Sequence, residues 1–179
     1  MPKRTSYAGV VFFLGLLIGG GGGFYLKPET DVQLAPAAEL FKGKPTYSVV
    51  RIVDGDTVVL LVDGKEEKVR LIGVDTPETV KPDTPVEEYG LEASRFTKNL
   101  LSGESVYVET DPGGAGKVDR YKRTLAFLYR VPDGLFVNLE LVRQGYGRVY
   151  RKVDFKYRPL FEKAEAAARD KKRGLWAQD

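Results

Sequence analysis

The sequence predicts an α+β fold that is mainly β: a five-stranded Greek-key barrel of the OB-fold type with about three packed helices, preceded by an N-terminal transmembrane or signal segment. Two observations favour the barrel. After residue 45, short β-rich runs separated by Asp-Gly pairs come first, and runs with helical spacing of apolar residues come later. Strands grouped early, with helices inserted later, are typical of a small barrel covered by helices.

The strands are predicted from runs of β-branched and aromatic residues that end at turn residues. The pairs Asp54-Gly55 and Asp63-Gly64 turn the first three strands into a meander, and two more strands follow later in the chain. The predicted strands are Tyr47–Val53, Thr57–Val62, Glu67–Val74, Ser105–Thr110 and Thr124–Val131.

The helices are predicted from apolar residues that recur every three or four positions. The second helix is short, and we expect the Asn138 side chain to cap its first turn and Gly145 to end it. The predicted helices cover Tyr89–Leu100, Leu139–Gln144 and Arg158–Lys172.

The N-terminal 26 residues have the pattern of a membrane anchor. Lys3 and Arg4 precede an uncharged, largely apolar run that is about long enough to cross a ~30 Å hydrocarbon layer as a helix. The positive-inside rule keeps the basic end in the cytoplasm and places the rest of the chain outside it. We therefore expect residues 1–26 to anchor an extracytoplasmic protein by a single segment. Secretion after cleavage of a signal peptide is the alternative.

The remaining chain divides into a linker and one folded domain. Residues 27–45 contain three prolines and little periodicity, which is typical of a linker. Residues 46–179 carry all the predicted strands and helices, and their number suits one modest domain. We expect this domain to be a monomer with no obligate protein partner.

The composition excludes several kinds of chemistry. The 179 residues include no His and no Cys, which rules out a Ser-His-Asp triad, a Cys nucleophile, a usual zinc site and disulfide bonds. The formal net charge is +3, and without Lys3 and Arg4 it is +1, so net charge alone does not indicate a polyanionic partner. Catalysis would have to use carboxylates, Arg, Lys, Tyr, hydroxyls or a hard cation.

Hairpin register predicts that several polar residues meet at one rim. If Asp63-Gly64 forms a two-residue turn, Arg70 lies opposite Thr57. Asp56 and Asp75 then lie just beyond the open end of the same hairpin. Such residues could also be ordinary turn and loop residues, so register alone does not establish a site.

An oxygen-rich rim of this kind suits calcium. The Asp56 and Asp75 carboxylates, the Thr76 carbonyl and the Glu78 carboxylate are all hard oxygen donors, which Ca²⁺ prefers and which disfavour zinc. Glu78 is placed to activate a water molecule by removing its proton.

Two arginines could bind a phosphodiester at this rim. Arg70 and Arg123 each present a guanidinium group that can hold phosphate oxygens through two hydrogen bonds. Together with a cation, they would offset the charge that builds on phosphorus when water attacks. The alternative is ordinary surface charge, since Arg70 could lie at a strand edge and Arg123 has basic neighbours.

Several motifs, in order along the chain, resemble the signature blocks of the staphylococcal nuclease (thermonuclease) family. The resemblance runs from about Tyr47 to Trp176. The blocks are Asp54-Gly55-Asp56-Thr57-Val58, Arg70-Leu71, Val74-Asp75-Thr76-Pro77-Glu78-Thr79, Tyr89-Gly90-Leu91-Glu92-Ala93-Ser94, Asp119-Arg120-Tyr121-Lys122-Arg123-Thr124-Leu125-Ala126 and Leu141-Val142-Arg143-Gln144-Gly145.

This resemblance implies a calcium-dependent endonuclease on an OB-fold barrel. Such an enzyme hydrolyses DNA and RNA with little sequence preference and leaves 3′-phosphate ends. By motif, the resemblance implies calcium ligands at Asp56, Asp75 and Thr76, catalytic roles for Arg70, Glu78 and Arg123, and nucleotide contacts at Arg120 and Tyr121. A non-catalytic nucleic-acid- or protein-binding module at the cell surface is the alternative, since the same barrel also serves as a scaffold.

Three features depart from the family pattern. Residues 80–85 are less Lys-rich than in well-known members, which predicts weaker duplex binding. Lys122 stands where glycine is usual. Residues 146–155 align poorly, which leaves open whether Tyr150 or Tyr157 stacks on a base.

Overall fold

The computed structural model describes residues 41–79, 85–131 and 133–177. The anchor predicted at residues 1–26 and most of the predicted linker lie outside these residues. Within the described part of the chain, no helix combines the length and apolar character that crossing a bilayer would require.

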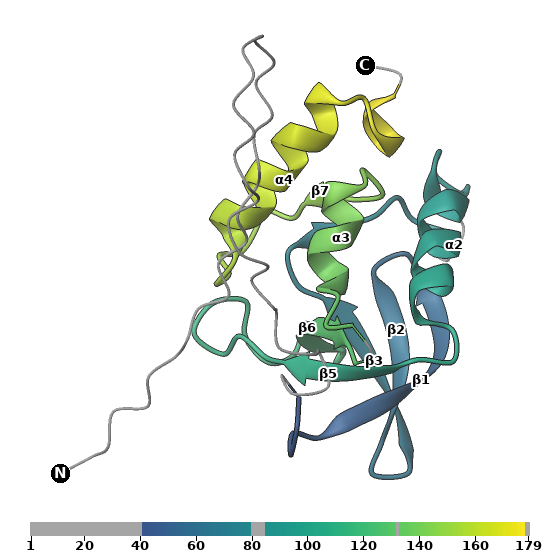
Figure 1. Ribbon diagram of the computed structural model, residues 1–179, viewed down its shortest axis with the longest axis vertical. Helices are drawn as coiled ribbons and strands as arrows, with labels where there is room; N and C mark the ends of the chain where they lie inside the picture. The colour runs from purple at the N-terminus through teal and green to yellow at the C-terminus, as the bar shows by residue number, and fades with distance from the viewer. Residues whose placement is uncertain (1–40, 80–84, 132, 178–179) are drawn as a thin grey trace, which may run out of the picture. The chain divides into compact units, whose positions relative to one another are not determined.

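Five strands close into a barrel, as predicted. Their order around the barrel is β1-β2-β3-β6-β5, and β5 pairs with β1 to close it (Figure 1). All neighbouring strands are antiparallel except β3 and β6, which are parallel. The strands are β1 (Thr46–Asp54), β2 (Thr57–Val62), β3 (Lys65–Leu71), β5 (Ser105–Glu109) and β6 (Thr124–Arg130). This arrangement fits the OB fold.

The turn between β2 and β3 fixes the register of the hairpin. Asp63 and Gly64 have φ angles of 48° and 75°, and positive φ at both positions is the signature of the tight type I′ turn. Thr57 pairs with Arg70, which confirms the predicted register. The open end of this hairpin is therefore where the predicted rim residues begin.

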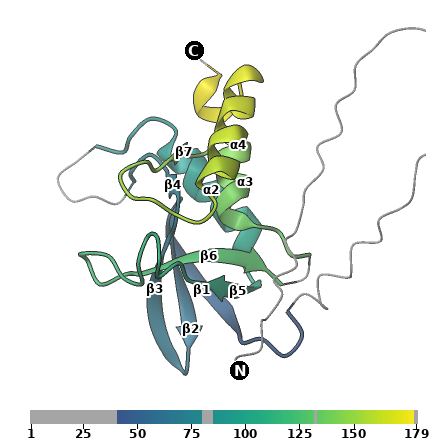
Figure 2. The same cartoon turned by 90° about the vertical axis from the view of Figure 1, so that its left-hand side faces the viewer.

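Three helices pack around the barrel in the described residues, close to the predicted ranges. They are α2 (Gly90–Leu101), α3 (Val137–Arg143) and α4 (Arg158–Asp170), and a short 3₁₀ turn, η1 (Gly174–Trp176), follows. α2 contacts β1, whereas α3 contacts both β6 and α4. Figure 2 shows α3 and α4 side by side.

The predicted cap of the second helix is wrong. α3 begins at Val137, and the Asn138 side chain makes no capping hydrogen bond. Asn138 is instead fully buried. It accepts a hydrogen bond from Leu128 N (2.9 Å) and donates to the carbonyl oxygens of Ile72 and Ala126 (3.0 Å each). Burial inside the fold outweighs the local preference of Asn for a helix start, because both N–H donors and the oxygen of the buried amide find hydrogen-bond partners there.

The third predicted strand is also corrected. It was expected over Glu67–Val74, but β3 ends at Leu71 and the chain turns at Gly73, whose φ is 80°. A Cβ at this position would lie 2.7 Å from the Phe155 ring, so glycine is required both by conformation and by packing. The chain then forms β4 (Val74–Asp75), which pairs with β7 (Arg148–Val149) as a separate two-stranded sheet (Figure 2).

The core lies between the inner face of the barrel and the helices, and includes Leu60, Leu71, Phe127, Leu141 and Phe161. One residue of the predicted linker also packs on the domain. Phe41 is buried and stacks on Tyr107 of β5, with 5.1 Å between ring centroids.

Candidate active site

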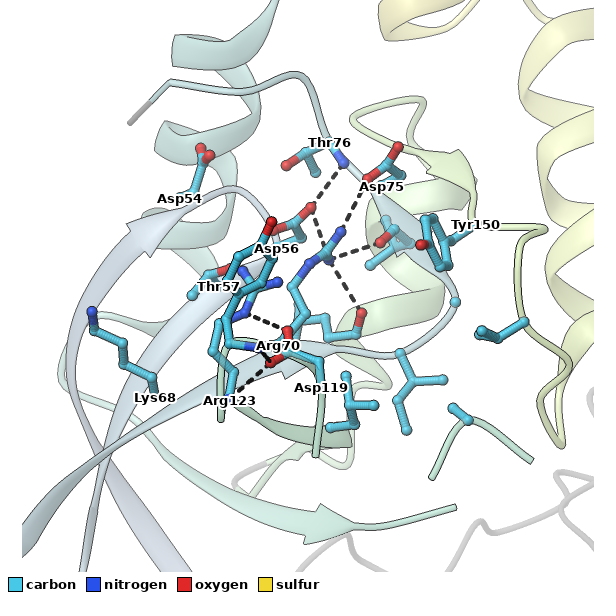
Figure 3. Close-up of a pocket in the computed structure, with 18 of the residues that line it drawn as sticks. Asp54, Asp56, Thr57, Lys68, Arg70, Asp75, Thr76, Asp119, Arg123 and Tyr150 are labelled. Atoms are coloured by element: carbon cyan, nitrogen blue, oxygen red, sulfur yellow. Dashed lines mark hydrogen bonds and ion pairs between the residues drawn. The ribbon is translucent and has the colours of Figure 1, made fainter. Parts of the chain in front are cut away.

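One cavity of about 990 Å³ lies beside the open end of the β2–β3 hairpin (Figure 3). It gathers all the residues that the sequence analysis singled out as candidate site residues. These are Asp56, Arg70, Asp75, Thr76, Glu78, Arg120, Tyr121 and Arg123. They come from four separate stretches of the chain, which the barrel brings together.

Arg70 occupies the centre of the charged cluster. Its Nη1 lies 2.8 Å from Asp56 Oδ2, and its Nη2 lies 3.0 Å from Asp75 Oδ1 (Figure 3). Nη1 also donates to the Val74 carbonyl oxygen at 2.9 Å. Because the Arg70 side chain is only 13% exposed, these partners hold the guanidinium in one orientation.

Asp56 joins the hairpin to the segment after β4. Its carboxylate is buried, and it accepts hydrogen bonds from Thr76 N and from the Thr57 hydroxyl, each at 3.0 Å. The Thr57 hydroxyl in turn accepts a long hydrogen bond of 3.5 Å from Arg123 Nη1. Thr57 therefore links the Asp56 carboxylate to the second arginine of the cavity.

The Asp75 carboxylate is the more accessible of the two aspartates. Burial raises the pKa of Asp75; the charge of Arg70 opposes this rise, and the neighbouring Asp56 adds to it. Among the residues that the structure describes, none donates a hydrogen bond to Asp75 Oδ2. This oxygen is available to a cation, which would also reduce the repulsion between the carboxylates.

The donor set fits a hard cation of the calcium type. Asp56, Asp75 and the Thr76 carbonyl supply oxygen alone, which is the chemistry that Ca²⁺ prefers. The described residues contain no cluster of three or more His, Cys, Asp or Glu side chains arranged to hold a metal. With only two carboxylates, such a site would need carbonyl and water oxygens to complete the coordination shell.

The second arginine is held by one carboxylate on a loop. Arg123 Nε lies 2.7 Å from Asp119 Oδ2, and the backbone N–H groups of Tyr121 and Arg123 donate to Asp119 Oδ1. Burial alone would raise the pKa of Asp119, but the hydrogen bonds from Arg123 and Tyr121 outweigh it and lower the pKa. Asp119 therefore stays ionised and orients Arg123.

The middle of this loop contains a backbone conformation that favours glycine. Lys122 has a φ of 61°, and this left-handed conformation costs other residues free energy. The departure noted in the sequence, Lys122 in place of the usual glycine, therefore falls at a position where glycine would be less strained.

Tyr121 extends from this loop as an exposed aromatic surface. Tyr121 is 63% exposed. The guanidinium carbons of Arg120 and Arg123 lie 4.7 and 5.3 Å from the centroid of its ring. An exposed ring with two cations beside it can stack on a nucleotide base while the cations attract the phosphates.

Glu78 reaches the cavity from the segment after β4. Its carboxyl group is hydrogen-bonded to the Asp54 side chain, and it also accepts a hydrogen bond from Thr79 N at 3.1 Å. The backbone of this segment is fixed to Glu87, since Glu78 N donates to Glu87 Oε2 and Glu87 N donates to the Glu78 carbonyl. Residues 80–84, where the Lys-poor loop was noted, lie outside the described residues.

Asp54 was recognised in the sequence only as a turn residue. Its buried carboxyl group accepts hydrogen bonds from Gly55 N (2.8 Å), Thr79 N (3.2 Å) and the Thr79 hydroxyl (2.8 Å). Burial raises its pKa to about 6, and the hydrogen bond with Glu78 contributes to the rise. Asp54 thus ties the segment carrying Glu78 to the end of β1.

The structure also distinguishes the two tyrosines that the sequence left open. Tyr150 lines the cavity (Figure 3). The Tyr157 hydroxyl lies 3.1 and 3.2 Å from the two carboxylate oxygens of Glu109, and its ring packs edge-on against Phe127. Tyr157 is therefore part of the packing between α4 and the barrel.

Four other polar residues of the cavity were not predicted as site residues. They are Thr57, Lys68, Asp119 and Lys152. A signal existed for Lys68, which lies two residues before Arg70 on the same strand, and for Asp119, which lies four residues before Arg123.

Comparison with known proteins places the chain among nucleases. The family model "Staphylococcal nuclease homologue" matches residues 68–178. The chain is 42% identical to the thermonuclease of Staphylococcus hyicus over 133 residues, which cover 74% of this chain and 76% of that protein. It is 42% identical to the thermonuclease of Staphylococcus intermedius over 157 residues, 87% of this chain and 84% of the other.

A relative named as an endonuclease also matches most of the chain. Endonuclease YncB of Bacillus subtilis (strain 168) is 36% identical over 130 residues, which cover 72% of this chain and 60% of that protein. Together with the barrel and the cavity it carries, these matches confirm the resemblance found in the sequence: the chain belongs to the staphylococcal nuclease family.

Proposed function

We propose that the chain is a calcium-dependent endonuclease that hydrolyses phosphodiester bonds of DNA and RNA with little sequence specificity and leaves 3′-phosphate ends. The observation that carries the proposal is that one cavity brings together five charged residues: Asp56, Arg70, Asp75, Glu78 and Arg123. The thermonuclease and endonuclease relatives support it.

In this mechanism the two arginines bind the phosphate that is cleaved. Arg70 and Arg123 donate hydrogen bonds to its non-bridging oxygens, where negative charge grows as the phosphorus gains a fifth bond. Their carboxylate partners hold both guanidinium groups in place before substrate binds. The site therefore needs little rearrangement as the reaction proceeds.

Glu78 acts as the general base. Its carboxylate takes a proton from a water molecule, whose oxygen forms a new bond to phosphorus. The bond between phosphorus and the 5′-oxygen then breaks, the 5′-oxygen takes up a proton from solvent, and the phosphate stays on the 3′-side. Glu78 is positioned by its side-chain hydrogen bond with Asp54 and by the hydrogen bond that it accepts from Thr79 N. The Thr79 hydroxyl donates in turn to Asp54.

A calcium ion bound by Asp56, Asp75 and the Thr76 carbonyl would supply positive charge beside the phosphate and help bind the substrate. The aromatic rings of Tyr121 and Tyr150 suit the nucleotides on either side of that phosphate, with Arg120 beside Tyr121. Stacking of this kind does not depend on the identity of the base, which supports low sequence specificity.

We also propose a location for the enzyme from its N-terminal segment. The basic and apolar pattern of residues 1–26 supports an enzyme anchored by one N-terminal segment with its catalytic domain outside the cytoplasm. We propose that this enzyme is a monomer. Protease added to intact cells should then digest the domain. Protection until the cells are lysed would reverse this topology.

Cleavage of closed circular DNA tests the catalytic proposal. The purified chain should nick and then linearise the circle with Ca²⁺, whereas Zn²⁺ or a chelator should not support cleavage. The new ends should block a polymerase until a phosphatase removes the 3′-phosphate. Glu78→Gln is the matched inactive control. Full activity in the chelator would contradict calcium dependence, and binding of DNA without any cleavage would favour the non-catalytic module.

A further inference from the structure

The cations that line the cavity fall into two groups. Arg70 and Arg123 are paired with carboxylates inside the cavity. Lys68, Arg120 and Lys152 line the same cavity, and none of these three forms an ion pair with any residue in the part of the chain that the structure describes. Lys152 lies close enough to Asp75 for its charge to lower the pKa of that carboxyl group. Because none of the three is held in an ion pair, the second group can bind an anionic ligand.

Lys68 lies on the same strand face as Arg70. The two residues are separated by one position on β3, so their side chains point to the same side and start about 6.6 Å apart. The preceding residue on this face, Glu66, is paired with Arg51 at 3.1 Å. Among the described residues, Lys68 therefore lies beside Arg70 without an ion-pair partner of its own.

Lys152 lies at the other side of the cavity. Its Nζ is 5.9 Å from the centroid of the Tyr150 ring. Figure 3 shows Tyr150 and Lys68 on opposite sides of the cluster that contains Arg70 and Arg123. The two unpaired lysines thus flank the paired arginines.

We propose that Lys68 and Lys152 bind the backbone phosphates of the substrate strand on the two sides of the phosphate that is cleaved. The inference rests on the proposed nuclease function and specifies its substrate: a continuous polynucleotide strand that passes through the cavity. Ammonium groups bind phosphates as point charges without reading the base. Sites on both sides favour cleavage within a strand over removal of terminal nucleotides.

The test compares a long and a short substrate in the full chain. The variants are Lys68→Gln and Lys152→Gln, and Lys65→Gln is the matched control, because Lys65 is exposed on the same strand as Lys68 but does not line the cavity. Each is assayed with Ca²⁺ on a 20-nucleotide single strand and on a dinucleotide that has only the scissile phosphate.

Each cavity variant should lower kcat/KM several-fold on the 20-nucleotide strand at low salt and leave the dinucleotide rate unchanged. The slope of log kcat/KM against log salt should become shallower by about 0.7 for each lysine removed, the value expected for one phosphate contact on a single strand. Lys65→Gln should match the wild type on both substrates.

Equal losses on both substrates, or no loss on either, would overturn the inference. Binding of a fluorescent 20-nucleotide strand, measured by anisotropy, separates this outcome from failure of the proposed function. If the wild type binds the strand but cleaves neither substrate, the nuclease proposal fails and the lysines are still judged by their effect on binding. If the wild type does not bind the strand, the inference fails as well.

Discussion

The cavity has two walls that hold the same kind of side chain in different ways. The strand wall, formed by Asp56, Arg70 and Asp75, places its arginine between two carboxylates and a backbone carbonyl. The loop wall, formed by Asp119, Tyr121 and Arg123, holds its arginine with one carboxylate and a long hydrogen bond to Thr57. The Arg70 side chain is 13% exposed, and the Arg123 side chain is 27% exposed.

This difference indicates that two arginines proposed for the same catalytic role need not contribute equally to the stability of the fold. Removing the partners of a buried charge is costly, because an unpaired charge is then left in a poorly solvated place. We therefore expect the strand wall to contribute to stability as well as to the proposed catalysis. The loop wall is more exposed, so we expect it to contribute mainly to catalysis.

The largest expected effect is at Glu78, which belongs to neither wall. Glu78→Gln should lower turnover by roughly 10²–10⁴-fold, because the amide cannot accept the proton from water. Calcium affinity, measured by calorimetry, should stay close to that of the wild type, since the proposed ligands are untouched. Near-normal turnover would show that Glu78 is not the base.

Replacement of each arginine by lysine tests the comparison directly. Arg70→Lys and Arg123→Lys should each lower turnover by roughly 10²–10³-fold, because lysine keeps the charge but loses the paired hydrogen bonds. Only Arg70→Lys should also lower the melting temperature, since a single ammonium cannot bridge Asp56 and Asp75 as the guanidinium does.

The matched control for both is Arg95→Lys, because Arg95 is exposed on α2 and does not line the cavity. If both cavity variants retained turnover, and their alanine counterparts lost only affinity that weakened further with added salt, the arginines would be an ordinary basic surface. Equal losses of stability in the two lysine variants would remove the distinction between the walls.

The next prediction concerns Asp54, which lies beside the strand wall and should make the free energy of unfolding depend on pH. Its pKa is raised from 3.8 to about 6, so between these pH values the folded state binds more protons than the unfolded state. Its contribution to the free energy of unfolding therefore falls as pH rises through this window, by up to about 3 kcal/mol. Asp54→Asn should lack that fall.

Urea unfolding at several pH values between 4 and 7, in the presence of a chelator, measures this difference. Above pH 6 the variant should be more stable than the wild type, because it avoids a buried negative charge beside Glu78. Identical pH profiles for the two proteins would mean that Asp54 titrates normally.

The smallest expected effect concerns strain in the loop wall. Lys122→Gly should raise the free energy of unfolding by about 0.5–1 kcal/mol, because glycine adopts the φ of 61° without the clash that a Cβ creates. The gain is limited by the greater freedom that glycine has in the unfolded chain. A decrease in stability would show that the Lys122 side chain makes a compensating contribution.

The sequence predicted the strand wall well, because its geometry follows from short-range rules. An Asp-Gly turn sets the register of one hairpin, and the register brings Asp56, Arg70 and Asp75 to one end. For the loop wall, the residue types suggested Arg123 as a second phosphate-binding arginine, but no local pattern placed it at the rim, and the roles of Arg120 and Tyr121 came only from the family resemblance. Asp119 and Arg123 reach the cavity because β6 pairs with β3 in parallel, a contact between distant segments that local patterns do not specify.

The two errors have the same origin. A break in the third strand at Gly73 depends on the Phe155 ring, and the role of Asn138 depends on partners in two distant segments. In each case, contacts with distant segments of the chain decide the residue's role, and its local sequence preference does not.

The buried amide of Asn138 has a mechanical consequence for the cavity. The Asn138 side chain is hydrogen-bonded to the Ile72 carbonyl and to two backbone groups of β6. A shift of the first turn of α3 would therefore break hydrogen bonds to the bend before Asp75 and to the strand that follows Arg123. The chain segments next to both walls are thus hydrogen-bonded to the same side chain, Asn138. Changes in the distance between the two arginines must then come from side-chain rotation or from the loop before β6, and not from sliding of the barrel strands.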